Sequence, residues 1–204
     1  MNNDEDYIYL VHLKLTKIPL EIVDKVKIEL RRNQISEMNF EYSEKTKYLD
    51  ISDNKIKEMC NLKNLPNLIY LDLSYNLFKK INVEIFKLEE LYLIGNDIEK
   101  ITLPILPNLR ILDLAGNNIC QIENLNYIKN VKHLDKLQIF DLQNNLIEKL
   151  DCFVLPLSLK CIMLSDNKKL KSLDNIKLLN HLEVVGLERT NIKNIETNAT
   201  VWYK

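Results

Sequence analysis

One spacing of apolar residues recurs along almost the whole chain and limits what the chain can fold into. Residues 109–119 read Leu-Arg-Ile-Leu-Asp-Leu-Ala-Gly-Asn-Asn-Ile, with leucine at the first, fourth and sixth places and asparagine at the ninth. The same form begins again at Leu68, Leu88, Leu137, Leu159 and Leu182, with another apolar residue at the fourth place in the last three and threonine in place of asparagine in the last. It is less complete in residues 27–35 and 48–56. Self-similarity at a short fixed period predicts one structural unit that is stacked many times on itself.

The asparagines give the period of this pattern. Asn54, Asn76, Asn96 and Asn117 lie 22, 20 and 21 residues apart. An L-x-x-L-x-L-x-x-N form at such a period is the signature of the leucine-rich repeat, whose short strands line the inside of a solenoid. The predicted fold is therefore an α/β leucine-rich-repeat solenoid. It should be curved, with parallel strands on the concave face and short 3-10, helical or extended segments on the convex face.

The repeats should form a single domain over residues 1–204. We expect an N-terminal cap in residues 1–25, about eight repeats in 26–195, and a C-terminal cap or tail in 196–204. One repeat is longer, because Asn117 and Asn145 are 28 residues apart. Apolar residues recur there at every third place from Ile128 to Leu137, which predicts a short helix on the convex side. Whether that helix takes part in function stays open.

Composition excludes several classes of function. The chain has 28 Lys+Arg and 29 Asp+Glu, so net charge neither favours nor excludes nucleic acid. It has no apolar run of about 18 residues that would span a membrane. The acidic start and four cysteines without a C-x-x-C pair predict a reduced protein of the cytoplasm or nucleus. Isolated histidines and only three glycines predict no enzyme, metal site or cofactor.

The outward positions of the strands are the ones free to carry function. In Leu112-Asp113-Leu114 the leucines share the buried face, and Asp113 points away from it. Along the repeats this position is mostly acidic at first and neutral later. An apolar patch beside carboxylates fits a protein partner, although aspartate is also a common soluble residue in such strands. The predicted partner-binding residues of the concave face are Asp50, Asp72, Tyr92, Ile111, Asp113, Ile139, Asp141 and Met163.

A row of lysines just after the asparagines predicts a basic edge. Its members are Lys57, Lys80, Lys100, Lys149, Lys171 and Lys193, and Gln121 interrupts it. Such a row could bind the phosphates of RNA, which makes a ribonucleoprotein component the alternative function. The solvated rim of a lysine-rich protein is the simpler explanation of the row. Arginine is scarce, which argues against recognition of specific bases.

The repeats resemble those of one family in particular. Residues 71–76 read Leu-Asp-Leu-Ser-Tyr-Asn, and Ile-Glu-Asn-Leu at 122–125 follows an Asn-Asn-Ile. Over residues 28–195 the chain is similar to the leucine-rich-repeat regulatory subunits of protein phosphatase 1, and more loosely to the spliceosomal U2 A-prime protein. The resemblance implies that Asp50, Asp72, Tyr92, Asp113 and Asp141 grip a phosphatase catalytic subunit. Met163 and Gly186 depart from the charged or aromatic residues expected at their positions.

Overall fold

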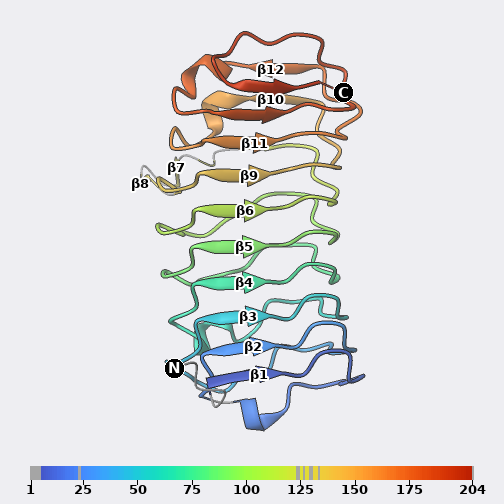
Figure 1. Cartoon of the computed structure of the whole chain (residues 1–204), viewed down its shortest axis with the longest axis vertical. Helices are drawn as coiled ribbons and strands as arrows, with labels where there is room; N and C mark the ends of the chain where they lie inside the picture. Colours follow the sequence, from blue (N-terminus) through green and yellow to red (C-terminus); the bar gives the residue numbers. More distant parts are fainter. Residues whose placement is uncertain are drawn as a thin grey trace.

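The chain folds into a solenoid whose turns each add one strand to a parallel sheet. The computed structural model describes residues 6–22, 24–122, 125, 127–128, 131–132 and 134–203. Within these residues ten strands form one sheet, and they stack in a single column (Figure 1). The strands are β1 (Tyr7–Tyr9), β2 (Lys27–Glu29), β3 (Tyr48–Asp50), β4 (Tyr70–Asp72), β5 (Glu90–Tyr92), β6 (Ile111–Asp113), β9 (Ile139–Asp141), β11 (Cys161–Met163), β13 (Val184–Gly186) and β14 (Thr200–Trp202).

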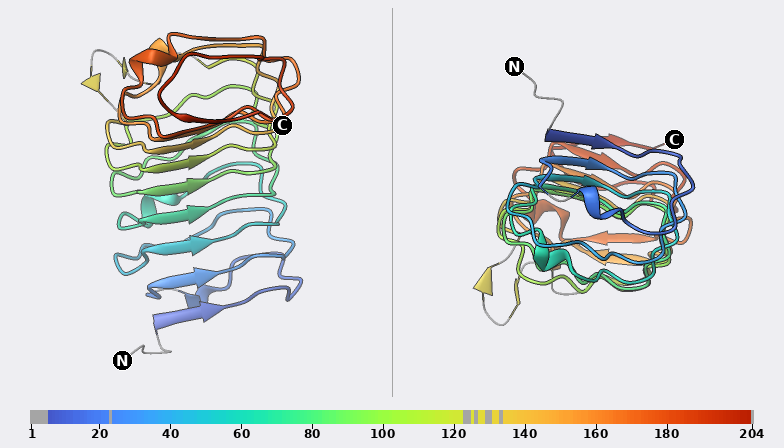
Figure 2. Two further views of the ribbon diagram at one scale, coloured as in Figure 1. Left: turned by 45° about the horizontal axis from the view of Figure 1, so that its top comes forward. Right: turned by 90° about the horizontal axis from the view of Figure 1, so that it is seen from below.

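The opposite side of the solenoid is mostly extended chain. β10 (Lys149–Asp151) and β12 (Ser172–Asp174) pair there in parallel, across the molecule from the main sheet (Figure 2). Helical structure in the described residues is limited to 3-10 turns, which are η2 (Leu20–Ile22), η3 (Leu62–Asn64), η4 (Cys152–Val154) and η5 (Ile176–Leu178). The structure therefore supports the predicted solenoid of parallel strands but not the α/β assignment. Ile81, Val83 and Ile85 are buried while the residues between them are exposed, which is the alternation of extended chain.

The core is a stack of equivalent apolar side chains from successive turns. The middle residue of each strand points inward, and Leu49, Leu71 and Leu91 lie in register with no exposed surface. The residues two places later, such as Leu73 and Leu93, are also fully buried. A strand of three residues cannot bury its apolar face alone, so each turn depends on its neighbours for stability.

An asparagine ladder closes the turns, as the sequence predicts. Asn117 Oδ1 accepts a hydrogen bond from the Ile98 N–H at 3.0 Å, one turn earlier. Its Nδ2 donates to the Leu93 carbonyl at 2.9 Å and to the Leu114 carbonyl at 3.0 Å. Equivalent bonds are made by Asn54, Asn76, Asn96, Asn145 and Asn167. These side chains satisfy buried backbone groups that the strands leave unpaired.

The residue before each ladder asparagine has a left-handed backbone. Gly95 and Gly116 occupy two of these positions, with φ of 63° and 67°. Residues that adopt this conformation less readily occupy the others, namely Arg32, Asp53, Tyr75, Asn144 and Asp166. The surroundings of Gly95 also favour glycine, because a Cβ there would lie 2.7 Å from Cδ1 of Tyr75 and the ring would have to move.

The ladder ends where the sequence departs from the repeat. Leu170 lies three residues after Asn167 instead of two, and it is fully buried. Its N–H donates to the Asn167 carbonyl at 2.9 Å, within its own turn. An asparagine from the following turn is therefore not needed, and Thr190 takes that place with its hydroxyl donating to the Leu187 carbonyl at 2.9 Å. The inserted residue and the missing asparagine have one structural explanation.

The long repeat contains a hairpin where a helix was predicted. β7 (Tyr127–Ile128) and β8 (Val131–Lys132) pair antiparallel and project from the solenoid (Figure 2). Residues 129, 130 and 133, on which part of the prediction falls, lie outside the described residues. For the described residues the predicted helix is wrong.

The three-residue spacing of apolar residues that suggested this helix is a feature of the turn before each strand, and ordinary repeats have it too. The Leu137 N–H donates to the Leu134 carbonyl at 2.9 Å, in a turn that leads into the next strand. Leu109 and Leu106 form the same turn at 3.2 Å, in a repeat of ordinary length. Leu134 has a φ of 63°, which no right-handed helix contains.

Strands are also present in the two segments expected to be caps. β1 pairs in parallel with β2, and β14 pairs in parallel with β13. Both extend the main sheet by one strand. The division into a cap, about eight repeats and a tail stays a prediction.

Candidate protein-binding face

The outward side chains of the main sheet form two parallel columns, which we call the strand face. The first column contains the first residue of each strand: Tyr7, Lys27, Tyr48, Tyr70, Glu90, Ile111, Ile139, Cys161, Val184 and Thr200. The second column contains the third residue: Tyr9, Glu29, Asp50, Asp72, Tyr92, Asp113, Asp141, Met163, Gly186 and Trp202. All eight residues predicted for the concave face lie in these columns, on adjacent strands (Figure 1).

Stacked tyrosines cover the N-terminal half of the strand face. The rings of Tyr48 and Tyr70 are nearly parallel, with centroids 4.0 Å apart. Tyr92 lies next to Tyr70 with a centroid distance of 5.2 Å, and its hydroxyl donates to Glu90 at 2.9 Å. Burial raises the pKa of Tyr70 and of Tyr92, so both hydroxyls stay neutral at physiological pH. These rings form a rigid surface with polar edges.

A lysine completes the tyrosine stack. Lys27 Nζ lies 4.3 Å from the ring centroid of Tyr48 and 2.8 Å from a carboxylate oxygen of Glu29. The hydrogen bond to Glu29 raises the pKa of Lys27, against the effect of its burial. This end of the strand face therefore already contains a cation paired with a ring and a carboxylate.

Apolar side chains occupy the C-terminal half of the first column. Ile139 is the most open of them at 39% exposure, and Ile111, Cys161 and Val184 are half-buried. The Cys161 thiol is free, and burial raises its pKa, so it stays neutral and behaves as an apolar group. In the second column Met163 lies over Gly186, where an added Cβ would be 2.8 Å from the methionine Cε. Together these residues form a contiguous apolar patch.

The aspartates of the second column have a structural role that sequence reasoning did not identify. Each accepts a hydrogen bond from the backbone N–H two residues later, for example Asp113 from Ala115 at 3.0 Å and Asp141 from Gln143 at 2.9 Å. Asp50 and Asp72 do the same. The carboxylates therefore each satisfy an N–H of their own turn. Asp50 is buried at 6% exposure, and the other three aspartates are half-buried.

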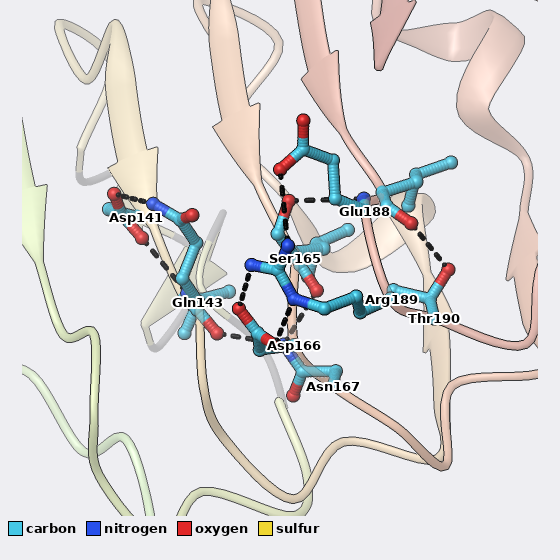
Figure 3. Close-up of polar contacts among 11 residues, drawn as sticks. Asp141, Gln143, Ser165, Asp166, Asn167, Glu188, Arg189 and Thr190 are labelled. Atoms are coloured by element: carbon cyan, nitrogen blue, oxygen red, sulfur yellow. Dashed lines mark hydrogen bonds and ion pairs between the residues drawn. The ribbon is translucent and has the colours of Figure 1, made fainter. Parts of the chain in front are cut away.

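Serines take over this role at Tyr92 and Gly186, two positions of the second column that have no aspartate. Tyr92 cannot accept such a bond, and the Ile94 N–H donates to Ser74 Oγ of the preceding turn at 3.2 Å. Gly186 cannot either, and the Glu188 N–H donates to Ser165 Oγ at 3.1 Å (Figure 3). A recurring serine two residues after a strand is the sequence signal that could have revealed this pattern.

Burial raises the pKa of three carboxylates in the second column. It raises the pKa of Asp113 to about 6, helped by the charges of Asp141 and Asp72 and opposed by the Ala115 N–H. Burial likewise raises the pKa of Asp72 and of Asp141. Among the described residues none of these three forms an ion pair. A cation from a partner would stabilise their charged forms.

The predicted basic edge is exposed but discontinuous. Lys57 and Lys80 line one groove, Lys80 and Lys100 a second, and Lys171 and Lys193 a third. All six lysines are exposed.

The row breaks at two points. At the first point Lys100 forms an isolated parallel β-bridge with Gln121, so a neutral residue takes the next place in the row. At the second point Lys149 lies opposite Ser172 and not Lys171, because the residue inserted after Asn167 shifts the register by one. Carboxylates of Glu58, Asp97 and Glu99 line the same grooves as the lysines. The structure therefore places the lysines in separate clusters of mixed charge.

A cross-turn ion pair at the end of the strand face was also missed from sequence. Arg189 Nε and Nη2 donate to the two carboxylate oxygens of Asp166, each at 2.6 Å (Figure 3). Both residues precede a ladder position, and they are separated by one turn of 23 residues. That separation is the signal from which the pair could have been predicted.

Comparisons with known proteins agree with the repeat assignment. The family described as leucine-rich repeats in two copies matches residues 87–127. The leucine-rich repeat protein R380 of Acanthamoeba polyphaga mimivirus is 44% identical over 79 residues, covering 38% of this chain and 18% of R380. Human epiphycan is 37% identical over 124 residues, covering 52% of this chain and 38% of epiphycan.

Solved structures show the same fold. YopM from Yersinia enterocolitica has a TM-score of 0.71 at 20% identity, covering 96% of this chain and 39% of YopM. InlJ from Listeria monocytogenes has a TM-score of 0.64 at 20% identity, covering 92% of this chain and 46% of InlJ. The chain thus spans less than half the length of each relative described here.

These likenesses show leucine-rich repeats in residues 87–127 and the solenoid fold for most of the chain. They support the resemblance to phosphatase regulators only at the level of the repeat. Within the described residues, no helix is both long and apolar enough to cross a membrane.

Proposed function

We propose that this leucine-rich-repeat chain is a non-catalytic scaffold that binds a protein partner through its strand face. The observation that carries the proposal is that an apolar region and an acidic region of the strand face adjoin in the middle of the sheet. The apolar patch of the first column, centred on Ile139, lies directly beside the carboxylates of Asp113 and Asp141, which form no ion pair with any described residue. A partner with apolar anchors and basic neighbours is complementary to this surface.

The scaffold would act by presenting a preformed surface. The outward side chains stand on strands whose positions are fixed by the core and the asparagine ladder, and the tyrosines are already stacked. Binding would therefore order few groups of this chain, and less free energy would be lost to conformational entropy. The phosphatase catalytic subunit implied by the sequence resemblance is the first candidate partner. A cytoplasmic or nuclear location is part of the same proposal.

The direct test is affinity purification from extract with charge variants of the second column. Asp113→Asn with Asp141→Asn removes both charges but leaves an oxygen that can accept the backbone N–H. We expect this double variant to weaken capture of the partner about tenfold or more. Asp113→Lys with Asp141→Lys should abolish capture.

The matched control carries charge changes on the lysine edge. Lys80→Glu with Lys100→Glu alters two exposed residues of the basic edge, and capture should be unchanged. Equal capture by wild type and by the Asp113→Lys, Asp141→Lys variant would contradict the proposal.

The alternative is a ribonucleoprotein component that docks through the lysine edge. It has less support, because carboxylates line the same grooves as the lysines and the row is interrupted. RNA binding there should fall steeply with salt. It should also be lost in the Lys80→Glu, Lys100→Glu variant and retained in the aspartate variants.

A further inference from the structure

The geometry points to the kind of segment that the strand face receives: an amphipathic α-helix lying along the solenoid axis. We infer that the helix crosses β6, β9, β11 and β13, with its apolar stripe on the first column. This inference rests on the proposed function and specifies the shape of the partner. It depends on the spacing of the apolar side chains and on the charges on either side of them.

The spacing of the apolar column matches a helix better than an extended peptide. Neighbouring strands are about 4.8 Å apart, so the four apolar residues of the column span about 14 Å. Three turns of α-helix advance about 16 Å, which leaves a drift of about 2 Å. Side chains on one face of an extended chain repeat every ~6.8 Å, and three such repeats drift by about 6 Å. A helix can therefore place one anchor near each strand. The four apolar residues are Ile111, Ile139, Cys161 and Val184.

The two sides of the apolar column differ in their balance of charge. On one side, about 7 Å away along the strands, are the carboxylates of Asp113 and Asp141. On the other side, immediately before β6, β11 and β13, are Arg110, Lys160 and Glu183, with side chains 52%, 49% and 67% exposed, so two cations stand against one carboxylate there. A helix about 10 Å wide would cover the apolar column and reach both charged rows.

This arrangement requires a helix with two different flanks. The flank over Asp113 and Asp141 must be basic, and the flank over Arg110 and Lys160 must be acidic or neutral. Arg110 and Lys160 have ion pairs with Glu89 at 3.5 Å and Glu183 at 3.6 Å, but exposed pairs of this kind are weak and can be exchanged. Because the flanks of a helix swap when its direction is reversed, the charges also select one direction of the partner along the axis.

Selection from two peptide libraries tests the inference. One library is built on a stable helical hairpin randomised on one exposed face, and the other consists of linear peptides without helix propensity. Both are selected against the whole chain, and the binders are measured with Ile139→Glu and with Lys149→Glu as the matched surface control. We expect helical binders with apolar residues at i, i+3 or i+4, i+7, and i+10 or i+11, and with basic residues on one flank. Ile139→Glu should weaken them at least tenfold, and Lys149→Glu should not.

The other outcomes separate the two proposals. Linear binders that are lost with Ile139→Glu and tolerate proline at every position would overturn the helical inference and leave the proposed function standing. Binders from both libraries that are insensitive to Ile139→Glu would overturn both. A helical library that yields no binder to the strand face would also overturn the inference. A central proline in a selected helix should abolish its binding.

Discussion

The asparagine ladder allows a quantitative prediction for Asn117→Ala. Asn117 is 5% exposed, and its side chain joins two turns of the solenoid. The substitution removes an acceptor from the Ile98 N–H and donors from the Leu93 and Leu114 carbonyls. If each of these bonds contributed about 1 kcal/mol independently, the loss would be roughly 3 kcal/mol.

The neighbouring asparagines reduce that figure. Asn96 also donates to the Leu93 carbonyl at 3.1 Å, and Asn145 also donates to the Leu114 carbonyl at 2.9 Å. Both carbonyls therefore keep a partner in the variant, and the group left buried and unpaired is the Ile98 N–H. An unsatisfied buried donor costs about 1–3 kcal/mol, and with a single such group we expect a value near 2 kcal/mol.

Urea denaturation measures this loss as a shift of the unfolding midpoint. Asn118→Ala is the control, because Asn118 is the next residue, has the same side chain and is exposed. Its free energy of unfolding should stay within about 0.5 kcal/mol of wild type. Comparable m-values are needed, since a repeat protein can unfold in parts. An unchanged midpoint for Asn117→Ala would refute the role assigned to the ladder.

Further predictions concern the left-handed positions and the buried carboxylates. Gly116→Ala should cost about 1 kcal/mol of unfolding free energy through backbone strain alone. Gly95→Ala should cost more, because the Tyr75 ring must move, and adding Tyr75→Ala should remove the excess in a double-mutant cycle. The pKa of Asp113, about 6, lies above its unfolded value, so the native state binds more protons between about pH 4 and 6 and loses stability as pH rises through that window. Asp113→Asn should therefore be more stable than wild type at pH 7.5, by on the order of 1 kcal/mol after solvent screening, and equal differences at pH 4.0 and 7.5 in urea titrations would contradict this.

The features that repeat in the structure are those that could be predicted from the sequence. The buried leucines and the ladder asparagines recur because every turn faces the same packing and hydrogen-bonding requirements. The outward residues of the strand face follow from the alternation of side chains along a strand. Ile139 and Asp141 could thus be placed on this face without a structure.

The features missed from sequence depend on contacts between particular turns. The hairpin of β7 and β8 lies in an insertion, where the period gives no guidance. Leu134 and Leu137 resembled part of a helix only because the turn before each strand also has a spacing of three residues. The shift in strand register that places Lys149 opposite Ser172 accompanies the hydrogen bond from the Leu170 N–H to the Asn167 carbonyl. The spacing in the sequence shows the inserted residue, but it does not show which acceptor the Leu170 N–H uses.

Site-specific photocrosslinking tests the central claim most directly. A benzophenone amino acid replaces Ile139, which is open on the strand face, or Lys149, which is exposed in β10 on the opposite side. The partner captured from extract should crosslink strongly from position 139 and hardly at all from position 149. Crosslinking from position 149 alone would show that the strand face is not the binding surface.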